Sequence, residues 1–155
     1  MTTQVLHFVE LSRDDRRRIS ALRDLGRAGK LELRVKASED GRRAVPLPPD
    51  AAGALVALGD MPGIRAPDID LMVAAFMRAR GAAIVRATQR GKRGNPVILP
   101  AALFGPAAAL DGDVGARHLV ETSGIEIVDV EIGPRASLDV DTPQALKTAR
   151  KMLGR

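Results

Sequence analysis

Asp60 is the first candidate for a chemical role, because it follows one glycine after the five apolar residues at 54–58. Such a run predicts a strand buried on both faces, as in a parallel sheet, and the Gly-Asp-Met-Pro sequence at 59–62 predicts where that strand ends. Open α/β sheets bind their ligands at the edge where parallel strands end. A carboxylate at that edge suits a hard cation that holds a phosphate. The structural alternative is that Asp60 or Asp68 caps the helix that follows.

Two further acids, Asp139 and Asp141, lie near the carboxyl terminus in the sequence Leu-Asp-Val-Asp-Thr-Pro. In an extended segment the side chains of these two residues share one face, and those of Leu138 and Val140 share the other. One of the two acids could therefore face the same site as Asp60.

Basic residues in two loops could neutralise a phosphate. The loop at 89–96 combines Arg93 with two other cations and with glycines that let a backbone approach phosphate oxygens closely. The alternative for this loop is a basic hairpin turn. A second loop, at 110–117, opens a helix whose exposed amides could hold an anion within reach of Arg117. Here the alternative is that Asp113 caps the helix.

Composition bounds the class of protein. The chain has 155 residues, of which 45% are hydrophobic, so it can form one domain with its own core. It contains no Cys, which excludes disulfides, thiolate metal sites and a Cys nucleophile. The start of the chain lacks the pattern of a signal peptide, and no apolar run approaches the roughly 20 residues that cross a bilayer. We therefore expect a soluble cytoplasmic protein without a membrane partner.

The positive charge raises the question of nucleic acid. The net charge is +5 and the sequence pI is about 10.4. However, the chain has no Trp or Tyr and only three Phe, so it offers few platforms on which bases could stack. The basic cluster at 13–18 includes acids and lies near an expected helix start, which is typical of a solvated face. Nucleic acid is therefore not the favoured partner.

The spacing of apolar residues predicts alternating strands and helices. Strands are expected at 5–9, 31–35, 54–58, 82–86, 97–99 and 125–130. Helices are expected at 12–28, between Asp68 and Gly81, from the loop at 110–117 to about Ser123, and at 144–153. This order predicts an α/β layer fold with parallel strands.

Four segments carry a resemblance to a known family. In order they are 59–62, 93–97, 112–117 and 139–143, and together they resemble the MobA-like nucleotidyltransferase family, most closely its molybdenum cofactor cytidylyltransferases. The resemblance covers residues 51–153 well and residues 1–50 only as a generic strand-helix-strand, so a single domain over 1–155 is expected. It implies a Rossmann-like three-layer αβα sandwich with a mostly parallel sheet, of the nucleotide-diphospho-sugar transferase type.

The resemblance also implies an activity. Such enzymes move a nucleoside monophosphate from a nucleoside triphosphate, here with CTP favoured, to a phosphorylated acceptor such as molybdopterin. Asp60 and Asp141 correspond to the acids that bind Mg²⁺. Arg93, Asn95 and Arg117 are candidates to contact the nucleotide or the acceptor, although relatives usually carry His in place of Asn95. An acceptor phosphate is already a nucleophile, so the protein needs no Ser, Cys or His of its own.

The chain departs from the family at its amino terminus. The family's first strand and the glycine-rich Leu-Ala-Ala-Gly loop that cradles the triphosphate have no counterpart, so residues 5–9 match the second strand and the fold is expected to be amino-terminally truncated. The missing strand normally lies within the sheet, and each buried backbone group left unpaired costs about 1 to 3 kcal/mol. Either the sheet rearranges, or a partner chain completes it, or the coding sequence is truncated. A catalytically silent interaction module is therefore the alternative to an enzyme.

Overall fold

The computed structural model describes residues 5–10, 31–36, 51–58, 61, 63–109, 112–138 and 143–152. Its strands are β1 (Val5–Glu10), β2 (Leu31–Lys36), β3 (Gly53–Leu58), β4 (Ile84–Gln89), β5 (Lys92–Pro100) and β6 (Ile127–Glu131). Its helices are α2 (Ala66–Arg78), α3 (Phe104–Ala108), α4 (Gly112–Thr122) and α5 (Pro143–Met152), with short 3₁₀ turns η2 (Ala101–Leu103) and η3 (Gly133–Ala136). The helix expected at 12–28 lies outside the described residues.

The described strands form one mixed sheet in the order β2-β1-β3-β5-β4-β6. β1 runs parallel to β2 and β3, and β4 runs parallel to β6. β5 is antiparallel to both of its neighbours, β3 and β4. The expectation of parallel strands is therefore wrong for β5, because a tight hairpin joins it to β4 and reverses the chain.

The turn of this hairpin lies at Arg90 and Gly91, whose φ angles of 51° and 73° fit a type I′ turn. β5 then begins at Lys92, so most of the loop expected at 89–96 is strand. The basic hairpin turn, which the sequence left as an alternative to a phosphate loop, is the structure that these residues adopt.

β1 pairs directly with β3 along its whole length, from Val5 opposite Gly53 to Glu10 opposite Leu58. The described strands therefore leave no gap between β1 and β3, and the ladder is continuous across the place where a strand was expected to be missing. In the described part of the chain, β1 is thus the direct neighbour of β3.

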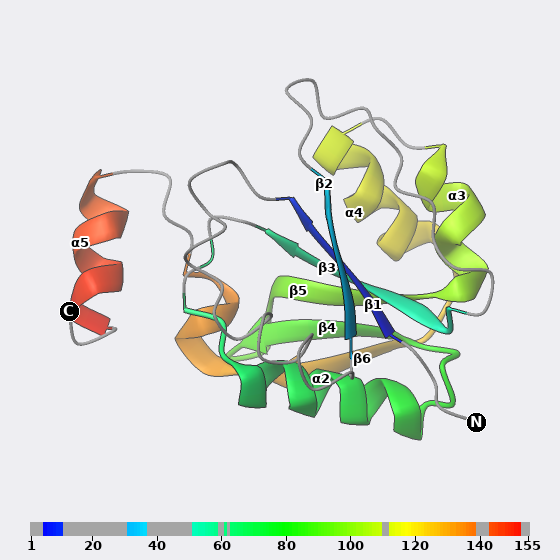
Figure 1. Ribbon diagram of the computed structural model, residues 1–155, viewed down its shortest axis with the longest axis horizontal. Coiled ribbons are helices and arrows are strands. Elements are labelled where there is room, and N and C mark those ends of the chain that lie inside the picture. The colour runs from blue at the N-terminus through cyan, green and yellow to red at the C-terminus, as the bar shows by residue number, and fades with distance from the viewer. Residues whose placement is uncertain are drawn as a thin grey trace.

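Helices cover both faces of the sheet (Figure 1). On one face α2 buries Ile69, Met72 and Phe76, which recur at helical spacing, against a core that includes Leu55 and Ile98. On the other face Ile84, Leu99 and Leu103 are buried, with Ala107 of α3 and Leu119 and Val120 of α4 packed against them. This arrangement confirms the three-layer αβα sandwich.

The carboxyl-terminal part contains the strand expected at 125–130, as β6, followed by the 3₁₀ turn η3. Pro134 in this turn lacks a backbone N–H and cannot donate to a sheet ladder. The extended segment expected to carry Asp139 and Asp141 lies outside the described residues. Within the described ranges, none of the helices has the length and apolar character needed to cross a membrane.

Candidate functional site

The candidate site lies at one end of the sheet, which we call the carboxyl edge. Here β3 ends at Leu58, β4 ends at Gln89 and β6 ends at Glu131. Because β5 is antiparallel, its first residue also lies at this edge. The segments that follow β3 and β6, and the hairpin turn between β4 and β5, therefore meet at the left-hand side of Figure 1.

Asp60 and Asp141 lie outside the described residues, but residues that flank their segments are described and are in contact. A Cβ atom placed on Gly63 would lie 3.0 Å from Cδ2 of Leu138 and 3.4 Å from Cγ of Arg135. Leu138 is buried, and a side chain at Gly63 would require Leu138 to move by a few tenths of an ångström. The segment after β3 and the segment after η3 thus pack against each other.

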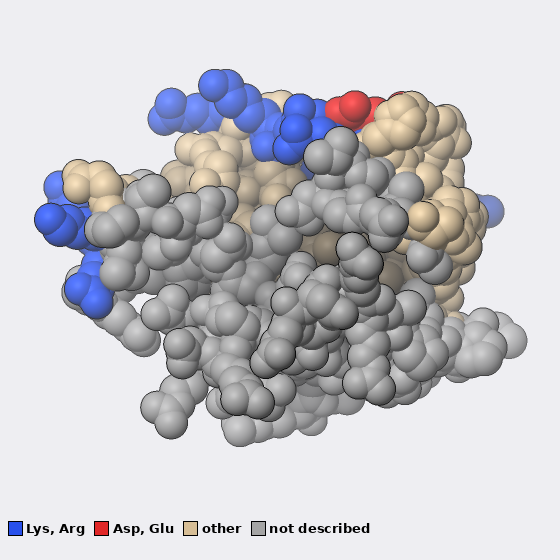
Figure 2. Space-filling view, turned by 90° about the horizontal axis from the view of Figure 1, so that it is seen from above, with Lys and Arg blue, Asp and Glu red and all other residues tan. Residues whose placement is uncertain are grey.

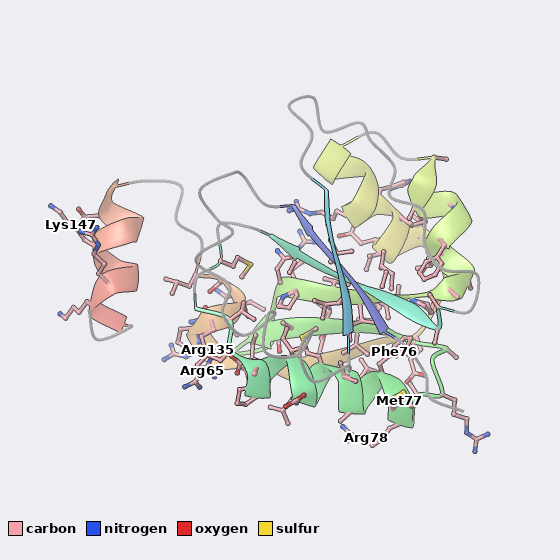
Figure 3. The ribbon with its side chains drawn as sticks, viewed as in Figure 1. Arg65, Phe76, Met77, Arg78, Arg135 and Lys147 are labelled. Atoms are coloured by element: carbon pink, nitrogen blue, oxygen red, sulfur yellow. The ribbon has the colours of Figure 1, made fainter. Side chains whose placement is uncertain are left out.

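Asp68 lies at the start of α2 and is buried. Its Oδ2 accepts a hydrogen bond from the backbone N–H of Arg65 at 3.0 Å, which caps the helix. The N-cap position expected for Asp68 is wrong, because Arg65 holds that position and the helix begins at Ala66. Asp68 lies in the first turn and accepts the N–H of the N-cap residue instead. No pattern in the sequence predicted its second partner, Arg135 of η3, which lies beside Arg65 in Figure 3 and binds the same carboxylate.

Arg93 and Arg117 both lie on exposed surface. The guanidinium of Arg93 on β5 forms an ion pair with Glu121 of α4. Arg117 lies one helical turn before Glu121 on α4. Both arginines therefore lie near the place where the amino-terminal part of β5 approaches α4. Asn95 is half-buried on β5, and the register that joins Val56 to Val97, if continued, brings it level with Leu58 at the end of β3.

Gly94, between Arg93 and Asn95, serves a packing role. A Cβ atom at this position would overlap the backbone carbonyl of Ala136 in η3. Of the two glycines considered as phosphate contacts, Gly91 therefore forms the hairpin turn and Gly94 admits the backbone of η3. This close approach ties β5 to the segment that leads toward Asp141.

Glu131 is a residue at the carboxyl edge that the sequence did not single out. Its carboxylate accepts hydrogen bonds from the hydroxyl of Thr88 at 3.1 Å and from the backbone N–H groups of Gly91 at 3.3 Å and Gly133 at 3.1 Å. A backbone hydrogen bond from Arg90 is the main reason that the pKa of Glu131 lies below its ordinary value, with partial burial opposing the shift. The only signal for Glu131 in the sequence was the expected hairpin turn, because the backbone N–H groups of a turn need a hydrogen-bond acceptor.

Positive charge gathers at this part of the molecule. The hairpin exposes Arg90, Lys92 and Arg93, and the last turn of α5 carries Arg150 and Lys151. In Figure 2, Lys and Arg side chains cluster along the upper rim and at the left-hand end, where α5 lies. Such a surface attracts polyanions. Within the described part of the chain, no three His, Cys, Asp or Glu side chains are grouped so that they could hold a metal ion.

The fold and the place of the site define a class of protein. A mixed α/β sheet between helical layers is the fold of nucleotide-diphospho-sugar transferases. The profile of the MobA-like NTP transferase domain matches residues 38–128, more than half of the chain. The chain belongs to this family, and by family it is a nucleotidyltransferase, which confirms the resemblance found in the sequence.

Solved structures share the fold at low identity. A Mycobacterium sp. strain JC1 homolog of Mycobacterium tuberculosis Rv0371c has a TM-score of 0.65 and 22% identity, with 97% of each chain covered. Rv0371c itself, solved in complex with manganese, has a TM-score of 0.64 and 19% identity, with 96% of this chain and 98% of that chain covered. The 4-diphosphocytidyl-2C-methyl-D-erythritol synthase of Anaerococcus prevotii has a TM-score of 0.62 and 10% identity, with both chains fully covered. Among curated proteins there is no significant match.

Proposed function

We propose that this protein is a Mg²⁺-dependent nucleotidyltransferase that moves a nucleoside monophosphate from CTP to a phosphorylated acceptor such as molybdopterin. Asp60 and Asp141 bind the ion in this proposal, and Arg93, Asn95 and Arg117 contact the nucleotide or the acceptor. The observation that carries the proposal is the contact between Gly63 and Leu138, since it joins the segments on which the two acids lie.

The donor set and the chain lengths fit a magnesium ion. Mg²⁺ is held by one or two carboxylates together with phosphate and water oxygens, which two aspartates can provide. Gly63 lies three positions after Asp60, and Asp141 lies three positions after Leu138. Three extended residues span at most about 11 Å, so the chain is long enough to bring both carboxylates to one ion. The manganese in a structure of similar fold supports a divalent metal.

The reaction needs positioning and charge neutralisation. An oxygen of the acceptor phosphate attacks the α-phosphorus, a new P–O bond forms, and the bond from the α-phosphorus to the oxygen bridging to the β-phosphorus breaks. That oxygen keeps the electron pair and leaves as part of pyrophosphate. A bound Mg²⁺ neutralises charge on the phosphates. The chain's own residues hold the attacking oxygen of the acceptor phosphate in line with the α-phosphorus of the nucleotide.

Arg93 is available for such a role despite its ion pair. The side chains of Arg93 and Glu121 are 54% and 49% exposed. An ion pair this exposed contributes at most about 1 kcal/mol, so an incoming phosphate can displace Glu121 without a large penalty. Arg117 lies on the same face of α4 as Glu121. A phosphate that takes the place of Glu121 would therefore lie between Arg93 of β5 and Arg117 of α4.

CTP is favoured over GTP on the basis of the sequence resemblance and of the structural neighbours. Cytidylyltransferases from Thermus thermophilus and Leptospira borgpetersenii share the fold at TM-scores of 0.57 and 0.58. A CMP:2-keto-3-deoxy-manno-octonic acid synthetase solved with CTP has a TM-score of 0.62. The molybdopterin acceptor rests on the sequence resemblance alone.

Calorimetric titration with CTP and with GTP, each with and without Mg²⁺, tests the proposal. We expect saturable CTP binding that requires Mg²⁺ and that weakens at least roughly 10-fold in Asp60→Asn, because a metal ligand is lost. Asp70→Asn is the matched control, since Asp70 is exposed on α2 and its substitution removes the same charge. It should bind CTP as the unmodified protein does.

The alternative is a catalytically silent interaction module of the same fold. If the folded protein binds neither nucleotide in the presence of Mg²⁺, the enzyme proposal is wrong and the module takes its place.

A further inference from the structure

Glu121 of α4 occupies the place on Arg93 that the proposed function gives to a phosphate. Nη1 of Arg93 donates a hydrogen bond to Oε1 of Glu121, although the two residues are 28 positions apart in the chain. The packing of α4 on the sheet brings them together, since Leu119 and Val120 lie in the same hydrophobic cluster as Leu99 of β5. The fold therefore supplies a carboxylate of its own to this guanidinium.

The contact uses little of what Arg93 can donate. The N–H donors of a guanidinium form a planar fork that matches two oxygens of a carboxylate or a phosphate. Arg86 uses this fork fully, because it binds Asp129 through both Nε and Nη2. Glu121, by contrast, receives a single hydrogen bond from Arg93. A ligand that accepts two parallel hydrogen bonds is therefore a stronger partner for Arg93 than Glu121 is.

Glu121 competes with every anion that approaches Arg93, because it belongs to the same molecule. A tethered group acts at an effective concentration on the order of millimolar. Because both side chains are about half exposed, their ion pair is weak enough to open. Each anion must first displace Glu121, so the affinity of every anion for Arg93 falls by the same factor.

A ligand that withstands this loss must interact with more than Arg93. Arg117 lies one helical turn before Glu121 on α4 and adds a second cation on the same face of the helix. A phosphate monoester carries a charge of about −1.5 to −2 at neutral pH and several acceptor oxygens, which two guanidinium groups can share. A carboxylate or a phosphate diester carries one charge and gains less from the second cation.

We propose that Glu121 is a built-in competitor at the phosphate site of Arg93, and that phosphate monoesters are the class of ligand that displaces it. This inference rests on the proposed function, in which Arg93 and Arg117 contact the nucleotide or the acceptor. The acceptor phosphate of the proposed reaction belongs to this class. Glu121 acts through Arg93 without contacting the ligand, and it sets an affinity threshold below which singly charged anions do not remain bound.

Titration of the full chain with methyl phosphate, followed by phosphorus NMR, tests the inference. Glu121→Gln removes the competing carboxylate. Glu126→Gln is the matched control, since Glu126 is exposed and its substitution removes the same charge. Arg93→Gln establishes whether methyl phosphate binds at this site. Dimethyl phosphate, which carries one charge, tests the class of ligand.

The expected result is a gain of affinity. Glu121→Gln binds methyl phosphate roughly 3- to 5-fold more tightly than the unmodified protein, which is the gain that the loss of an exposed ion pair allows. Glu126→Gln binds it as the unmodified protein does, and Arg93→Gln binds it at least roughly 10-fold more weakly. Dimethyl phosphate binds more weakly than methyl phosphate to the unmodified protein and to Glu121→Gln. Because destabilisation does not increase affinity, this gain separates competition from a structural role of Glu121.

An unchanged affinity in Glu121→Gln overturns the inference, and the proposed function still stands if Arg93→Gln has lost binding. An equal gain in Glu126→Gln assigns the effect to net charge and overturns the competitor. Equal binding of the two phosphate esters overturns the class of ligand. If neither the unmodified protein nor Glu121→Gln binds methyl phosphate, or if Arg93→Gln binds it as tightly, Arg93 is not a phosphate contact. That part of the proposed function then fails together with the inference.

Discussion

Glu131 connects three pieces of the carboxyl edge through one side chain. Its carboxylate accepts hydrogen bonds from the end of β4, from the hairpin turn and from the first residue of η3. Because these donors stabilise the ionised form, the pKa of Glu131 lies below its ordinary value of 4.5 in the folded protein. The stabilisation is therefore present above about pH 4.5 and is lost as the pH falls through the folded-state pKa.

Glu131→Gln should reveal this dependence. We expect the variant to unfold at a lower urea concentration than the unmodified protein at about pH 7, and this difference to shrink as the pH falls through the folded-state pKa of Glu131. Glu126→Gln removes another exposed carboxylate near β6 and serves as the control. A difference for Glu131→Gln that stays constant from neutral to acidic pH would show that ionisation of Glu131 does not contribute.

At the scale of elements, the close passage of η3 over β5 is the contact that brings the segment after β6 to the edge. It depends on Gly94, where any side chain would overlap the carbonyl of Ala136. The contact holds β5, on which Arg93 and Asn95 lie, against the turn that carries Arg135.

Gly94→Ala should separate the two elements. We expect a loss of about 1 to 3 kcal/mol in the free energy of unfolding, because backbone must shift to admit a methyl group. Gly105→Ala on α3 is the control, since a Cβ atom there meets nothing within 4 Å beyond its chain neighbours. It should change the free energy of unfolding by less than Gly94→Ala does. Urea denaturation of both variants measures the contrast, and equal effects would contradict the contact.

Elements with a strong local pattern could be predicted from the sequence. The apolar run of β3 and the helical spacing of Ile69, Met72 and Phe76 on α2 lie where they were expected. The first part of β5 was missed, because Gly94 and Pro96 are typical of loops and only tertiary contact with η3 and β4 makes this segment a strand. β5 is antiparallel because it follows a hairpin turn, and the sequence left this turn open as the alternative to a phosphate-binding loop.

At the scale of the whole molecule, β3 is held between β1 and β5. The sequence could not predict the pairing of β1 with β3, because strand order depends on contacts between residues far apart in the chain. The same limit applies to the site. Motifs in the sequence predicted Asp60 and Asp141 as candidate site residues. The ion pair between Asp68 and Arg135 could not be predicted in this way, because the two residues share no motif.

Hydrogen exchange followed by NMR tests the closed sheet. Successive backbone amides of a central strand point alternately to its two neighbours. If β1 is seated beside β3, all amides at 54–57 should exchange slowly, since partners lie on both sides. Rapid exchange at every second residue of β3 would mean that the β1 ladder is absent.

The topology of the sheet also bears on the order in which it assembles. β4 and β5 are joined by a two-residue turn, whereas the pairing of Val5 with Gly53 must close a loop of almost a third of the chain. Since the entropy lost on closing a loop grows with its length, we expect the hairpin and its helices to form the folding nucleus and β1 to dock late. Until it docks, β3 exposes an unpaired apolar edge, and the newly made chain is most prone to aggregate during that interval.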